Sequence, residues 1–156
     1  MDVVATLAGW PGAVWLQRSG TAYLFINAAH ILGIGLILGA ILPLDLRLIG
    51  LFRQVPLPVL APFLTRVAAV GVCTAILTGF WLFTVQPDEY LNNTAFLAKL
   101  AILALAILNI GLQHGTRFYN AALKGGPVPL PARVMAATSA CFWLAALVAG
   151  RWIGFL

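Results

Sequence analysis

The sequence predicts an all-α integral membrane protein, built as an up-and-down bundle of four helices with both termini outside the membrane. Three observations predict this fold class. Hydrophobic residues make up 62 % of the 156 residues and charged residues only 8 %, whereas a soluble domain carries roughly 25 % charged residues. Four apolar stretches are each long enough to cross a hydrocarbon core of ~30 Å as a helix at ~1.5 Å per residue. The connections between them are short, as in a helical bundle.

The first apolar stretch, residues 21–42, has no formal charge and holds His30 in its middle. A titratable side chain at that depth is costly unless something binds it, so His30 is the first candidate functional residue. Three glycines follow it: Gly33, Gly35 and Gly39. They leave the helix thin, so that another helix or a flat ligand can approach. We expect this span to end near Pro43.

The other three spans are predicted at residues 67–85, 94–114 and 134–153. The proline-rich stretch between the first two spans is predicted to be a connector that begins with an extension of the first helix. Residues 1–18 are broken by a proline and carry Trp10 and Trp15, which favours a separate segment lying in the membrane interface. Residues 19–156 then form the four-helix domain. No acidic residue is expected inside a span.

The net charge of +5 indicates membrane orientation rather than a nucleic-acid partner. Six of the nine Lys and Arg residues lie in the connectors after the first and third spans: Arg47, Arg53, Arg66, Arg117, Lys124 and Arg133. Basic connectors remain in the cytoplasm. We therefore expect both of these connectors inside, both termini outside, and the lipid bilayer as the main partner.

This orientation converts sequence position into depth and brings three residues to one level in the outer half of the bundle. His30 lies roughly 13 Å and Lys99 roughly 8 Å below the outer surface, and the fourth span delivers Arg151 to the same outer third. A planar apolar cofactor with an anionic edge would use all three. Haem b fits, with the imidazole on iron, Gly33 allowing the macrocycle to pack, and the cations at the propionates. Lys99 with a neutral amine is one candidate for the second axial position, which is otherwise open.

Each of these residues also has an ordinary structural interpretation. His30 would hydrogen-bond a carbonyl or a threonine across the bundle, Lys99 would extend to the headgroups, and Arg151 would anchor the membrane edge. His114 lies about 22 Å from Lys99 along the third span, too far to share a small ligand with His30. We expect His114 to be an interfacial histidine, with a metal-ligand role as the alternative.

The residues therefore predict a haem b-binding membrane protein with an oxidoreductase or electron-transfer role, although no complete catalytic set identifies an enzyme. A redox protein or a quinone would be its partner. The second hypothesis is a non-catalytic accessory or assembly subunit, in a homo-oligomer or a larger membrane complex, because Gly35 and Gly39 form a GxxxG motif. The third is copper handling, for which the chain offers few soft ligands. Cys73 and Cys141 are expected to be small buried residues rather than disulfide partners or zinc ligands.

Several short motifs carry a family resemblance across residues 21–153. They are the mid-span His30, the pair Thr78-Gly79, the run Phe96-Leu97-Ala98-Lys99-Leu100 in a span closing on Asn109 and His114, and the ending Gly150-Arg151-Trp152-Ile153. The chain resembles small bacterial four-helix membrane proteins of unknown function, which implies a multi-pass protein of the bacterial inner membrane. More distantly it is similar to HemJ-type protoporphyrinogen oxidases, which implies haem with His30 as axial ligand and Lys99 as a second essential residue. The membrane domain of CopD-type copper-resistance proteins shares the Thr-Gly pair and the lysine-bearing helix.

Overall fold

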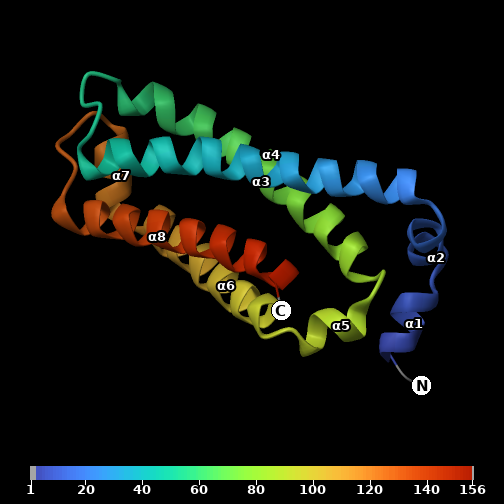
Figure 1. Cartoon of the computed structure of the whole chain (residues 1–156). Coiled ribbons are helices and arrows are strands. Elements are labelled where there is room, and N and C mark those ends of the chain that lie inside the picture. Colours follow the sequence, from blue (N-terminus) through green and yellow to red (C-terminus); the bar gives the residue numbers. More distant parts are fainter. Residues whose placement is uncertain (1–2, 156) are drawn as a thin grey trace.

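The computed structural model describes residues 3–155, and every regular element in that range is a helix. Four helices are long and apolar enough to cross a membrane. These are α3 (Gly20–Ile49), α4 (Leu57–Phe83), α6 (Thr94–Gly115) and α8 (Leu130–Trp152). The shorter elements are α1 (Val3–Gly9), α2 (Pro11–Arg18), α5 (Pro87–Asn92), α7 (Arg117–Leu123) and the 3-10 turn η1 (Ile153–Phe155). The prediction of an all-helical chain with four membrane-length helices is confirmed (Figure 1).

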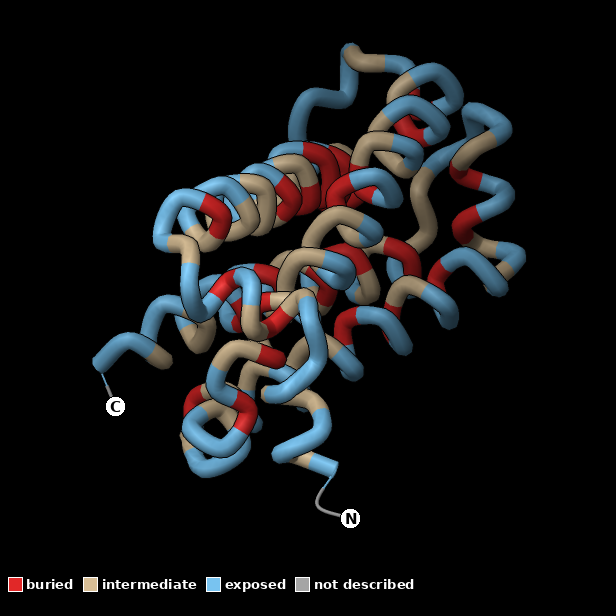
Figure 2. The backbone as a smooth tube through the Cα atoms, turned by 90° about the vertical axis from the view of Figure 1, so that its right-hand side faces the viewer, coloured by how far each residue is buried: buried red, intermediate tan, exposed pale blue. Residues whose placement is uncertain are grey.

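The four long helices pack as two pairs that are joined along one side. α3 packs along α4, α6 packs along α8, and α3 also packs against α8. Among the described residues α4 and α6 make few or no backbone contacts with each other, so this side of the assembly is open. Figure 2 shows the buried segments where the helices face one another and the exposed segments on their outer faces. Large apolar side chains cover those outer faces, for example Leu77 and Ile107, as contact with lipid requires.

Two glycines allow α3 and α4 to approach one another closely. A Cβ atom built on Gly33 would lie 2.9 Å from the backbone nitrogen of Ala75 and 3.0 Å from the carbonyl oxygen of Gly71. A Cβ atom built on Gly71 would lie 2.8 Å from the carbonyl oxygen of Gly33 and 2.9 Å from the backbone nitrogen of Ile37. These neighbours are backbone atoms that cannot rotate aside. The packing of α3 on α4 therefore depends on glycine at both positions.

The first long helix extends further than the apolar stretch alone predicts. α3 continues through Pro43 to Ile49, which confirms the predicted extension of the first helix beyond the apolar stretch. Proline removes one helical hydrogen bond, but apolar residues on both sides of it are buried and hold the helix together. The helix ends at Gly50, whose φ of 125° suits glycine. The extension carries Asp45 into the buried part of α3, which corrects the expectation of spans without acidic residues.

Two further expectations fail for identifiable reasons. α4 begins at Leu57 rather than at residue 67. Pro58 lies in the first turn, where backbone N–H groups have no helical partner, whereas Pro62 is accommodated inside the helix. Cys73 and Cys141 are free but exposed. The expectation that they are buried is therefore wrong. The apolar composition of a span does not show which face of the helix packs against the protein and which faces lipid.

Tryptophan side chains tie α1 and α2 to the end of α4. Trp10 donates from Nε1 to the hydroxyl oxygen of Thr84 at 3.0 Å, and Trp81 donates from Nε1 to the carbonyl oxygen of Gly12 at 3.0 Å. The ring centroid of Trp15 lies 5.9 Å from that of Trp81. These contacts hold the two short helices at the same end of the assembly as α5 (Figure 1). Their location in the membrane interface stays a prediction.

Replacing Gly71 by alanine should destabilise the protein, because the new methyl group would meet backbone atoms of α3 at under 3.0 Å. Overpacking of this kind costs about 1–3 kcal/mol. Thermal unfolding of the detergent-solubilised monomer measures the effect. The matched control is Gly111→Ala on α6, since a Cβ atom there has nothing within 4 Å. Equal melting temperatures for the two variants would contradict the glycine-dependent crossing.

Candidate functional site

His30 is half-buried on the face of α3 that packs against α4. Its Nδ1 atom lies 3.1 Å from the hydroxyl oxygen of Thr78. A Cβ atom built on Gly79 would lie 2.8 Å from Cε1 of the imidazole, so the ring occupies the space that a side chain at position 79 would need. Thr78 thus supplies a hydrogen-bond partner for the ring, and Gly79 supplies the room.

The Thr78 hydroxyl also determines which ring nitrogen of His30 carries the proton. Thr78 donates its single hydroxyl proton to the carbonyl oxygen of Thr74 at 2.6 Å. The hydroxyl oxygen therefore faces His30 as an acceptor, and Nδ1 is the donor. In the neutral ring Nε2 then holds a lone pair, which can accept a hydrogen bond or coordinate a metal ion.

Lys99 approaches His30 from α6. Its side chain is half-buried and lies against α8, because a Cβ atom built on Gly150 would lie 3.4 Å from both Cε and Nζ of Lys99. The ammonium group interacts electrostatically with the imidazole of His30. Each long helix therefore contributes to one location, which we name the His30 cluster: His30, Thr78, Gly79, Lys99 and Gly150.

Arg151 and Gly33 have other surroundings in the structure. Arg151 is exposed, and its guanidinium carbon lies 4.7 Å from the centre of the Phe155 ring. Gly33 is covered by the backbone of α4. The structure therefore brings together His30 and Lys99 from the predicted set, while cofactor contacts of Arg151 and Gly33 stay predictions.

His114 lies at the opposite end of α6 from Lys99. Its side chain is exposed, Nδ1 lies 2.9 Å from the carbonyl oxygen of Ile110, and its ring centroid lies 4.7 Å from that of Tyr119. Within residues 3–155, no group of three or more His, Cys, Asp and Glu side chains could hold a metal ion. Haem iron needs only one or two axial side chains, so a haem role for His30 or His114 does not depend on such a group.

Sequence reasoning missed Thr74, and it used Thr78, Gly79 and Gly150 only as parts of a family resemblance. Thr74 and Thr78 stand four residues apart in an apolar span, which places both hydroxyl groups on one helix face. That spacing was an available signal. Gly150 offered none, because a glycine near the end of a span has no specific meaning before its neighbours are known.

A model described as a family of unknown function, DUF6644, matches residues 8–156. The chain belongs to this family. Membership agrees with the predicted resemblance to membrane proteins of unknown function. No curated protein and no solved structure matches the chain, so the suggested likeness to HemJ-type and CopD-type proteins has no support from these comparisons.

Neutral His30 should carry its proton on Nδ1. The hydroxyl of Thr78 donates its proton to Thr74, so its oxygen can only accept a hydrogen bond from the imidazole. Nitrogen NMR of protein with ¹⁵N-labelled histidine measures the tautomer, in a His114→Gln background that leaves one signal. Thr78→Val should lower the Nδ1-protonated fraction, whereas Thr94→Val, at the start of α6, should leave it unchanged. If protein that retains Thr78 is mainly protonated at Nε2 of His30, the proposed hydrogen-bond chain is contradicted.

Proposed function

We propose that this protein binds haem b in the membrane and serves in electron transfer or as an oxidoreductase. The observation that carries the proposal is the His30 imidazole, which is held through Nδ1 by Thr78 and has its lone pair on Nε2. A histidine that ligates a metal usually donates its other ring nitrogen to a fixed acceptor in this way. The His30 cluster also contains the amine of Lys99, which is half-buried.

The proposed location is the bacterial inner membrane, with the four long helices forming an up-and-down bundle and both termini outside. The distribution of basic residues supports this orientation. Arg47 and Arg53 lie at the α3–α4 connection, and Lys124 lies between α7 and α8, at the end of the assembly away from α1, α2 and α5 (Figure 1). The His30 cluster then belongs to the outer half.

The donor set of the His30 cluster is of the kind that haem iron uses, since an imidazole is a common axial ligand. His30 would ligate the iron through Nε2, and the glycine at position 79 leaves room for the imidazole itself. Lys99 would serve as the second axial ligand or as a cation beside a propionate, and Arg151 would be a second cation at the same end. Haem supplies one-electron redox chemistry when bound. The chain contributes orientation of the imidazole and an apolar surrounding.

Substituting His30 should remove the haem, because the proposed iron ligand would be lost. Protein purified from cells supplied with haem should show a Soret band, and His30→Ala should bind at least tenfold less haem per protein. His114→Ala is the matched control and should keep the band. A colourless wild-type protein, or equal haem content in both variants, would refute the haem proposal.

One observation favours an accessory or assembly subunit as the second candidate. Gly35 and Gly39 are exposed on α3, and a Cβ atom at either position has nothing within 4 Å. This GxxxG face is therefore not used inside the chain, and such faces support close packing of membrane helices. A second copy or a larger complex would supply the packing helix.

If this second function is correct, a partner or a second copy should purify with the protein in fixed stoichiometry, and Gly39→Leu should abolish that association by blocking the thin face of α3. Gly111→Leu, at another open helical glycine, should leave it intact. Mass measurement of the detergent-solubilised complex decides the question. A wild-type protein that is strictly monomeric and alone would exclude this candidate.

A further inference from the structure

A cavity of about 310 Å³ lies between the long helices, away from the His30 cluster. Its wall is mainly apolar and includes Ile41, Leu44 and Val72. Residues of α3, α4, α6, α7 and α8 line it. Neither His30 nor Lys99 is among these residues, so this cavity is a separate place in the fold.

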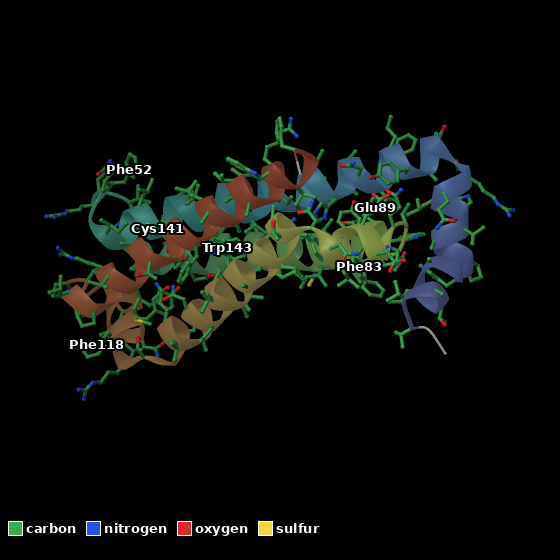
Figure 3. All side chains as sticks on the ribbon, turned by 60° about the horizontal axis from the view of Figure 1, so that its bottom comes forward. Phe52, Phe83, Glu89, Phe118, Cys141 and Trp143 are labelled. Carbon is green, nitrogen blue, oxygen red and sulfur yellow. The ribbon has the colours of Figure 1, made fainter. Side chains whose placement is uncertain are left out.

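Two buried polar atoms at this cavity have no hydrogen-bond partner among the described residues. They are Oδ2 of Asp45 and Nε1 of Trp143. Asp45 is 3 % exposed and Trp143 is 5 % exposed, and both residues line the cavity. Figure 3 shows Trp143 on α8, among the long helices. Buried polar groups are normally partnered by protein, water or a ligand, so a molecule bound in this cavity could supply partners for both the acceptor and the donor.

Two of the neighbouring hydroxyl groups already have hydrogen-bond partners. The hydroxyl of Ser139 hydrogen-bonds to the carboxyl group of Asp45, and the phenol of Tyr119 hydrogen-bonds to the side chain of Thr65. Burial raises the pKa of Tyr119 above its usual range, so this phenol stays neutral at physiological pH. Gln113 and His114 also line the cavity, but the fully buried polar atoms without a partner among the described residues are those of Asp45 and Trp143.

The cavity reaches the lipid-facing surface on the side where α4 and α6 do not pack together. Four of its lining residues are exposed: Ala69, Cys73, Ile107 and His114. A lipid-soluble molecule can therefore enter sideways from the bilayer. Such a ligand does not have to cross the charged ends of the helices.

We propose that this cavity binds the hydroxyl-bearing aromatic ring of a lipid-soluble phenol or quinol. A hydroxyl group is both a donor and an acceptor, so it can donate to Oδ2 of Asp45 and accept from Nε1 of Trp143. The rings of Trp143 and Tyr119 offer aromatic walls. Since an engineered cavity of ~150 Å³ admits benzene, the volume here suits a substituted ring.

The test uses the full-length protein in detergent and trimethylhydroquinone under argon, which is a quinol ring without a lipid tail. Isothermal titration calorimetry should show saturable binding to the wild type. The dimethyl ether of the same compound lacks the donor hydroxyls and should bind at least tenfold more weakly. This comparison needs no variant. Absent binding, or equal binding of the two compounds, would overturn the proposal and would indicate that water fills the cavity.

Variants assign the hydroxyl contacts to residues. Trp143→Phe keeps the aromatic wall and removes the N–H donor, and it should weaken binding about fivefold to tenfold. Asp45→Leu removes the acceptor and should weaken binding at least as much. The matched controls are Trp152→Phe and Asp88→Leu, both at exposed positions, and these should bind like the wild type. Unchanged affinity in a folded Trp143→Phe or Asp45→Leu protein would overturn the proposed site.

This proposal is independent of haem. The His30→Ala protein should bind trimethylhydroquinone with wild-type affinity, because His30 does not line the cavity. Loss of the Soret band with retained quinol binding would support both sites separately. Loss of quinol binding in a folded His30→Ala protein would contradict a binding site in this cavity that is separate from the His30 cluster.

Discussion

Apolar helices gain little by leaving lipid for one another, so their association requires close packing of backbones. α3 and α4 meet this requirement at Gly33 and Gly71, where any side chain would collide with the opposite backbone. The contact also has a local consequence, because His30 lies about one helical turn from Gly33. It is thereby brought against Thr78 and Gly79 on α4. The helix crossing and the orientation of the imidazole are therefore one structural feature.

The membrane imposes a second constraint, since it offers no water to buried polar groups. The His30 cluster satisfies it through a chain of hydrogen bonds from the imidazole to the Thr78 hydroxyl and on to the carbonyl of Thr74. The backbone of Ala75 also hydrogen-bonds to the ring. With the proton on Nδ1, the lone pair of the neutral ring lies on Nε2. Asp45 and Trp143 do not satisfy the constraint within the chain. The two regions therefore differ. The His30 cluster holds an imidazole in a fixed orientation, whereas the cavity at Asp45 and Trp143 contains buried polar atoms without hydrogen-bond partners.

The sequence predicts the helical class and the number of membrane-length helices, because the length and hydropathy of the apolar stretches determine both. It does not predict which face of a helix turns inward. Gly33 and Gly35 differ by two residues, yet one lies buried in a helix crossing and the other is exposed. Continuous apolar composition hides this difference, since lipid and protein interior are equally apolar. The buried position of Asp45 is not predicted for a related reason, because the helical extension after Pro43 is assigned to a connector and not to a packed span.

Asp45 and Trp143 each bury one polar atom that has no hydrogen-bond partner among the described residues. An unpartnered buried donor or acceptor lowers stability by roughly 1–3 kcal/mol, and apolar residues at both positions would avoid it. Other hydroxyl groups at the site have partners, since Ser139 hydrogen-bonds to Asp45 and Tyr119 to Thr65. Asp45 follows His30 by 15 residues on α3, about 22 Å along the helix axis, so this cost is not a by-product of the imidazole site. A ligand with both a donor and an acceptor resolves the cost at both atoms, whereas a purely apolar ligand leaves it in place.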